Sequence, residues 1–153
     1  VFVRDQLFAT LDPTMRKRRL QGEVTVIFAD TVGFLSHLPH RLIEAFKATL
    51  EEVTHASLLL HIVDVTAKDV KISVARVNEV LSEIGVEGMP RLMVYNKIDL
   101  HDTLKPRIDR DVYGMPVAVW VSGLSGAGID DLNGAVIERL NWESYDYHAQ
   151  DSR

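Results

Sequence analysis

The stretch VYNKIDL, residues 94–100, changes character halfway along. It continues an apolar run over residues 90–95 that is typical of a buried strand. The strand then gives way to an amide, an ammonium group and a carboxylate, on Asn96, Lys97 and Asp99. Ligands of open α/β sheets bind just beyond the carboxyl ends of the strands, so polar groups in this place indicate a binding site.

Strands and helices alternate along the rest of the chain. Apolar runs predict three further strands, over residues 24–29, 57–65 and 116–121, and residues 15–21 are expected to form a hairpin with the first of them through a turn near Gly22. Apolar residues at helical spacing predict helices over residues 41–53, 70–84 and 129–140, and a short helix is expected over residues 104–110. This order predicts an α/β fold with a mainly parallel sheet in residues 1–140, followed by a polar C-terminal tail in residues 141–153.

Composition narrows the class of protein. A chain of 153 residues suits one domain with a real core, and a formal net charge of -5 gives no bulk attraction to nucleic acid. With 0 Cys, the chain has no disulfides, thiol catalysis or thiolate metal sites, which fits a reducing compartment. The longest apolar stretch, residues 58–65, is far short of the ~20 residues that a membrane span needs, so no membrane span is expected.

The NKID stretch suits recognition of guanine. The carboxylate of Asp99 can accept two parallel hydrogen bonds, and guanine offers such a pair from its N1–H and its exocyclic amine, whereas adenine does not. Lys97 can lay its methylene stem along the plane of the base, and the amide of Asn96 can tie neighbouring loops together. A charged loop that follows a strand without binding anything is the alternative interpretation.

A second polar segment, DTVG at residues 30–33, follows the predicted strand over residues 24–29. Asp30 suits a site near a magnesium ion, because hard cations prefer carboxylate and water oxygens. Gly33 would let its backbone N–H approach a terminal phosphate without a Cβ in the way. By itself this segment is equally compatible with a plain turn at the end of a strand.

Together these segments resemble a GTPase domain, and the longer runs resemble the HflX family of translational GTPases. LFATLDPT, residues 7–14, resembles switch I of that family. DTVGF at residues 30–34, with LPH at 38–40 and AFKATLEE at 45–52, resembles its switch II and the helix that follows. The resemblance implies the three-layer α/β sandwich of a P-loop GTPase G domain, a cytoplasmic protein, GTP or GDP as ligand, Mg²⁺ as cofactor, and the large ribosomal subunit as partner.

The resemblance also implies roles for single residues. Thr10 would close over magnesium and the γ-phosphate, and Asp30 would be the magnesium-side acid of switch II. Ser122, Gly123 and Leu124 would back the guanine through a main-chain N–H. Phe34 stands where many GTPases keep a water-orienting Gln, so hydrolysis is expected to be slow without help from the ribosome.

The sequence contains no Gly-x-x-x-x-Gly-Lys-[Ser/Thr] loop for the phosphates. In the family this loop, with a strand and a helix, lies just before a segment like residues 1–3, so a βα unit of roughly 25 to 30 residues is expected to be missing. The chain by itself is then expected to bind nucleotide poorly and to have unpaired sheet edges that favour self-association. The alternative is a non-enzymatic, degenerate G-domain module that serves as a contact surface for protein or ribosomal RNA.

Two further features are less decisive. The basic run at residues 16–19 fits either a contact with ribosomal RNA phosphates or a charged edge strand that resists aggregation. His61, within a predicted buried strand, is expected to be a hydrogen-bonded core residue, and no His pair in the sequence has metal-ligand spacing.

Overall fold

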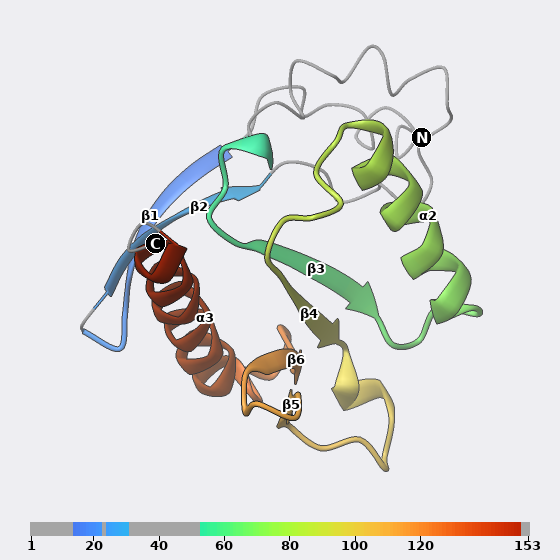
Figure 1. Ribbon diagram of the computed structural model, residues 1–153. Coiled ribbons are helices and arrows are strands. Elements are labelled where there is room, and N and C mark those ends of the chain that lie inside the picture. Colours follow the sequence, from blue (N-terminus) through green and yellow to red (C-terminus); the bar gives the residue numbers. More distant parts are fainter. Residues whose placement is uncertain (1–13, 23, 31–52, 151–153) are drawn as a thin grey trace. The chain divides into compact units, whose positions relative to one another are not determined.

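The computed structural model describes residues 14–22, 24–30 and 53–150 (Figure 1). The chain divides into two compact units of interleaved segments. The first unit comprises residues 1–19, 25–56 and 71–88, and the second comprises residues 20–24, 57–70 and 89–153. Of the helices in the described part of the chain, none has the length and apolar character needed to cross a bilayer.

The second unit is built on a four-stranded sheet in the order β3-β4-β6-β5 (Figure 1). Its strands are β3 (Leu59–Asp64), β4 (Arg91–Asn96), β5 (Arg107–Arg110) and β6 (Pro116–Trp120). β4 pairs in parallel with both β3 and β6, while β5 pairs antiparallel with β6. The prediction of an α/β fold with a mainly parallel sheet is confirmed.

The core of this unit is formed by the β-branched and leucine side chains that the sequence places on its strands. Leu92, Val94 and Val119 lose essentially all exposure to solvent. Helix α3 (Ile129–Gln150) packs against β6, β5 and β4 and buries Ala135 and Val136. The helix continues ten residues beyond the end expected at residue 140, so it includes most of the segment that was expected to be a tail.

The prediction of a short helix over residues 104–110 is wrong. Residues 107–110 form the edge strand β5 and join β6 through a turn that contains Gly114. Two features favour the strand: Pro106 disfavours helical backbone at the residue before it, and Asp111 caps the turn by accepting hydrogen bonds from the backbone N–H groups of Tyr113 and Met115, both at 2.9 Å. An edge strand tolerates the polar sequence RIDR because one side of its backbone needs no partner strand.

The first unit contains most of two paired strands and of one helix. β1 (Thr14–Leu20) pairs with β2 (Val24–Asp30) in a hairpin that turns at Gly22, as the sequence predicts, and Gly22 has a φ of 74°. Helix α2 (Val70–Glu83) is also confirmed, and the left-handed Gly85 (φ 76°) closes it. The helix expected over residues 41–53 lies almost wholly outside the described residues.

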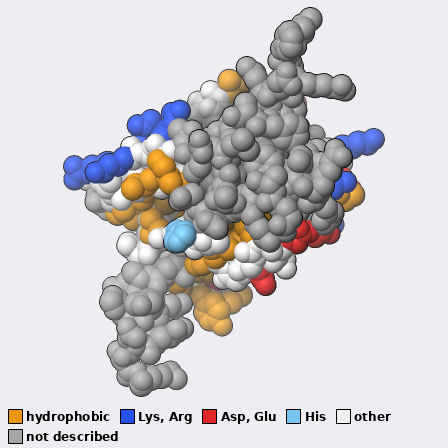
Figure 2. All heavy atoms as spheres, turned by 90° about the horizontal axis from the view of Figure 1, so that it is seen from above, with side chains coloured by type: hydrophobic (Ala, Val, Ile, Leu, Met, Phe, Trp, Pro, Cys, Tyr) orange, Lys and Arg blue, Asp and Glu red, His pale blue; other side chains and the backbone are white. Residues whose placement is uncertain are grey.

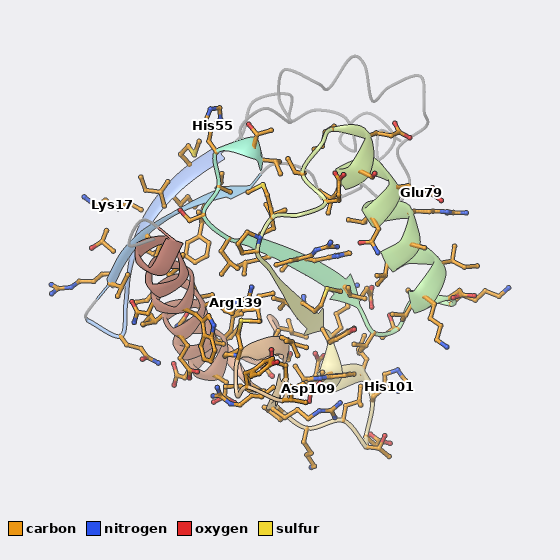
Figure 3. All side chains as sticks on the ribbon, in the orientation of Figure 1. Lys17, His55, Glu79, His101, Asp109 and Arg139 are labelled. Atoms are coloured by element: carbon orange, nitrogen blue, oxygen red, sulfur yellow. The ribbon has the colours of Figure 1, made fainter. Side chains whose placement is uncertain are left out.

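Arg139 joins α3 to the sheet at the amino ends of two strands. Its side chain reaches from the helix toward the strands (Figure 3) and is only 4% exposed. Nη1 donates hydrogen bonds to the carbonyl oxygens of Arg91 and Pro116, both at 3.0 Å. Because these carbonyls begin β4 and β6, one guanidinium fixes the helix to both strands.

Replacing this guanidinium should cost stability. Arg139→Met keeps most of the apolar stem but leaves two carbonyl groups without their donor, so the free energy of unfolding should fall by about 2–4 kcal/mol. Arg110→Met is the matched control, because Arg110 forms an exposed ion pair with Glu138 and should lose only about 1 kcal/mol. Urea denaturation measures both variants, and equal losses would contradict the proposed role of Arg139.

His61 is buried in β3, at 8% exposure. Within the described part of the chain its Nδ1 has no hydrogen-bond partner, so the expectation of a fully hydrogen-bonded histidine is wrong. Burial, helped by the positive charge of Arg91, lowers the pKa of His61 from 6.5 to about 4. The imidazole is therefore neutral in the folded protein at neutral pH.

This histidine should make stability depend on pH. His61 takes up a proton near pH 6.5 in the unfolded chain but only near pH 4 in the folded chain. Its contribution to the free energy of unfolding is therefore fully present above pH 6.5 and is lost as the pH falls toward 4. The free energy of unfolding of the wild type, minus that of His61→Gln, should fall by about 2 kcal/mol between pH 7 and 4.5. Parallel pH profiles for the two proteins would contradict this assignment.

Candidate functional site

The carboxyl ends of three parallel strands bring polar residues together in the second unit. Asp64 ends β3 and Asn96 ends β4, and the two residues are direct partners in the parallel register. Ser122 follows β6 two residues after its last residue, Trp120. The structure therefore places two of the segments expected to bind nucleotide, residues 96–99 and 122–124, at the same edge of one sheet.

The side chain of Asn96 joins these two segments. Its Oδ1 accepts hydrogen bonds from the backbone N–H of Lys97, at 2.8 Å, and of Gly123, at 2.9 Å. A Cβ on Gly123 would lie 3.5 Å from the same oxygen, which is ordinary contact, so the site has room for a larger residue there. The amide ties the loop after β4 to the loop after β6, as its place in the sequence predicts.

Asp99 is positioned by Ser122. The Ser122 hydroxyl, which is fully buried, donates a hydrogen bond of 2.5 Å to Oδ1 of Asp99. The backbone N–H of Ser125 donates in turn to that hydroxyl, at 3.0 Å. Asp99 itself is exposed at the start of the short 3-10 helix η2 (Ile98–Leu100), so its carboxylate is fixed in direction yet accessible to a ligand.

Lys97 has a backbone conformation that is uncommon for a residue with a side chain, with φ 70° and ψ 32°. Its Nζ lies 2.6 Å from Oδ2 of Asp64. The other oxygen of Asp64 accepts hydrogen bonds from the backbone N–H and the hydroxyl of Thr66, at 2.9 and 2.6 Å. The hydrogen bond from Lys97, followed by that from Thr66, lowers the pKa of Asp64 to about 2.

Sequence reasoning did not find this contact between Asp64 and Lys97. A signal was present, because Asp64 lies one residue before the end of the strand predicted over residues 57–65 and Asn96 directly follows the strand predicted over residues 90–95. Neighbouring parallel strands of similar extent place such residues side by side. The role of the Ser122 side chain was also missed, since the sequence pointed only to the backbone of residues 122–124.

An aromatic stack supports the site from the preceding residues of the strands. The rings of Tyr95 and Trp120 stack with centroids 4.4 Å apart, and the guanidinium of Arg107 lies 4.0 Å from the centre of the Trp120 ring. Asp109 accepts hydrogen bonds from Nε1 of Trp120, at 2.7 Å, and from Nε of Arg107, at 2.9 Å (Asp109 is labelled in Figure 3). These contacts link β4, β6 and β5 through Tyr95, which directly precedes Asn96, and Trp120, two residues before Ser122.

The remaining predicted site residues belong to the first unit. Thr10 and Gly33 lie outside the described residues, and so does Phe34. Asp30 is the last residue of β2. Among the residues that the structure describes, no three His, Asp or Glu side chains gather in a way that could hold a metal ion. The predicted magnesium ligands Thr10 and Asp30 stay a prediction.

Comparison with known proteins agrees with the chemistry of this site. A family model described as "50S ribosome-binding GTPase" matches residues 1–97. The chain belongs to this family. It is 49% identical to GTPase HflX of Escherichia coli K12 over 94% of the chain and 34% of that protein, and 47% identical to GTPase HflX of Caldanaerobacter subterraneus over 91% of the chain and 31% of that protein.

These relatives identify the chain as part of an HflX-type G domain, and it spans about a third of their length. Among solved structures, a crystal structure of a variant of the protein SsGBP has a TM-score of 0.67 at 23% identity, over 94% of this chain and 53% of that one. This likeness shows the fold, and together with the family match over residues 1–97 it confirms the prediction of a GTPase-type G domain.

The loop that carries Ser122 and Gly123 ends with two glycines of the G domain in the left-handed region, Gly126 (φ 84°) and Gly128 (φ 77°). They differ in their surroundings, because a Cβ on Gly126 would meet nothing within 4 Å, whereas a Cβ on Gly128 would lie 2.5 Å from the carbonyl oxygen of Trp120. The first position requires only backbone freedom, and the second also requires the absence of a side chain.

The two glycines therefore provide a matched pair of variants. Gly126→Ala should lower the free energy of unfolding by about 1 kcal/mol through backbone strain, and Gly128→Ala by about 3 kcal/mol, because the backbone must also move away from Trp120. Thermal or urea denaturation measures the difference. Similar losses at both positions would show that the close approach at Gly128 is unimportant.

Proposed function

We propose that this chain is the guanine-recognition and switch portion of a GTPase of the HflX type, which binds GTP and GDP with Mg²⁺ and hydrolyses GTP in contact with the large ribosomal subunit. The observation that carries the proposal is the arrangement of Asp99. Its carboxylate is oriented by Ser122 at the rim of the sheet, and Asn96 holds the neighbouring loop against it. Such a carboxylate matches the two parallel donors of guanine.

The adjacent groups complete a site for the base. Lys97 precedes η2 as its N-cap residue, two residues before Asp99, and its methylene stem supplies an apolar surface for one face of a purine. In the exposed loop over residues 123–126, the backbone N–H groups of Gly123, Ser125 and Gly126 already donate to Asn96 or Ser122. The backbone N–H of Leu124 is therefore the one in this loop that can donate to a ligand at the edge of the sheet. Adenine would leave the Asp99 carboxylate without its donors, and this is the physical basis of the proposed preference for guanine.

The phosphate side of the proposed site rests on sequence. Thr10 and Asp30 offer a hydroxyl and a carboxylate, which are hard oxygen ligands suited to Mg²⁺, and Gly33 offers a backbone N–H to the γ-phosphate. Bound Mg²⁺ would neutralise phosphate charge during hydrolysis. With Phe34 in place of a water-orienting Gln, hydrolysis would depend on a group from the ribosome.

A basic surface supports the ribosomal partner. The four residues 16–19 of β1 are all basic and all exposed. In Figure 2, Lys and Arg side chains lie along the left margin of the face, and further ones lie at its right margin. Lys17 extends away from the hairpin into solvent (Figure 3). Because the chain as a whole is acidic, this concentration of positive charge is a local feature that suits phosphate groups of ribosomal RNA.

Exchanging the carboxylate for an amide tests the proposed recognition of guanine. In the full-length protein, Asp99→Asn should weaken GDP binding by about 100-fold or more and make xanthosine diphosphate the preferred ligand, because xanthine has an acceptor where guanine has an amine. Competition against a fluorescent nucleotide measures both affinities. Asp102→Asn, which removes the same charge three residues later from an exposed position, should change neither affinity.

Retention of the preference for GDP in Asp99→Asn would contradict the proposal. So would an equal loss of affinity for both nucleotides with no change in their ratio, because that result indicates general damage to the site. A correctly folded variant is verified by its unfolding transition, which should lie within a few degrees of the wild type.

A further inference from the structure

Asp64 is a charged residue at the carboxyl end of β3, in the described part of the sheet, and the proposed recognition of guanine gives it no role. It comes from β3, whereas the residues that contact the base in the proposed function come from the loops after β4 and β6. In the parallel register Asp64 is the partner of Asn96, so the fold holds it one strand away from the start of the NKID loop. Its side chain is directed to Lys97.

Thr66 orients the carboxylate of Asp64 independently of its contact with Lys97. Both hydrogen bonds from Thr66, one from the backbone and one from the hydroxyl, go to Oδ1. This arrangement leaves Oδ2 for Nζ of Lys97, at 2.6 Å. Since its pKa lies at about 2, Asp64 remains ionised at any pH at which the protein would work.

Lys97 is consequently held at both ends. Its backbone N–H is bonded to Asn96 and its backbone is in the left-handed region, while its ammonium group is bonded to Asp64. A free lysine side chain has many rotamers, and a ligand that packs against its stem must restrict them. Because Asp64 already anchors the ammonium of Lys97, most of these rotamers are excluded before the ligand binds.

We propose that Asp64 is a positioning residue for guanine nucleotides, which acts by anchoring Lys97 so that its stem is ready to cover one face of the base. This role rests on the proposed function, because it requires a base beside Lys97. It does not require Asp64 to contact the nucleotide, and it assigns Thr66 the task of orienting Asp64.

The same contact contributes little to the stability of the fold. The side chains of Lys97 and Asp64 are 50% and 38% exposed, and ion pairs with this exposure add little to the free energy of folding. The importance of the pair should therefore appear in nucleotide affinity and hardly at all in thermal unfolding. This contrast separates a positioning role from a structural one.

Asp64→Asn tests the role in the full-length protein. The amide keeps an oxygen for Thr66 but loses the charge that anchors Lys97, so the Kd for GDP should rise about three- to tenfold, mainly through faster dissociation. The ratio of the affinities for GDP and xanthosine diphosphate should stay as in the wild type, because Asp99 is intact. Tm should change by no more than about 3 °C, and Asp102→Asn should match the wild type throughout.

A double-mutant cycle shows whether Asp64 acts through Lys97. Lys97→Met keeps an apolar stem and removes the ammonium, and the Asp64→Asn/Lys97→Met protein should bind GDP no more weakly than Lys97→Met alone. Thr66→Val, which removes one hydrogen bond to Asp64, should weaken binding less than Asp64→Asn does. Additive effects of the Asp64 and Lys97 changes would overturn the proposal, as would an unchanged Kd in Asp64→Asn.

The result for Asp99→Asn distinguishes failure of the proposed guanine recognition from failure of the proposed role of Asp64. If that variant switches its preference to xanthosine diphosphate while Asp64→Asn binds GDP like the wild type, only the role of Asp64 is overturned. If Asp99→Asn keeps its preference for GDP, the proposed recognition of guanine fails and the role of Asp64 fails with it.

Discussion

The contact on which the candidate site depends is the pair of hydrogen bonds that Asn96 Oδ1 accepts from the backbone of Lys97 and Gly123. A single side-chain oxygen thereby fixes the loop after β4 and the loop after β6 in one arrangement. The first loop carries Asp99 and the second carries Ser122, so this tie also sets the distance over which the serine reaches the carboxylate. Without it, two exposed loops would have to find their mutual position each time a ligand binds.

The sheet makes this tie possible by fixing where its strands end. β3, β4 and β6 run parallel, and the register of β3 with β4 pairs Asp64 with Asn96 as their last residues. At the opposite end Arg139 fixes the starts of β4 and β6 to α3. The polar cluster thus stands on strands held at both ends, and a buried scaffold can keep exposed functional groups in place although exposed contacts are weak individually.

Much of this arrangement could be predicted from the sequence, because apolar runs and their polar ends are local signals. The strands over residues 24–29, 57–65, 90–95 and 116–121 appear close to their expected places, and Asn96 ties the loops as its amide suggested. β5 was mistaken for a helix, since its four polar-rich residues become a strand only through their pairing with β6. The roles of Asp64 and the Ser122 side chain depend on contacts across 33 and 23 residues, which local patterns do not reveal.

The contact between Asp64 and Lys97 also explains how Asp99 stays available. Lys97 and Asp99 are two residues apart, and an ammonium so close to a carboxylate is a natural partner for it in solution. A carboxylate that already accepts a lysine has fewer lone pairs to offer a base. In the structure the ammonium of Lys97 donates to Asp64, and the hydroxyl of Ser122 donates to Asp99. Each charged residue of the NKID segment therefore has its own partner. The fold supplies a second acid from another strand, and the acid of the motif is thereby kept for the ligand.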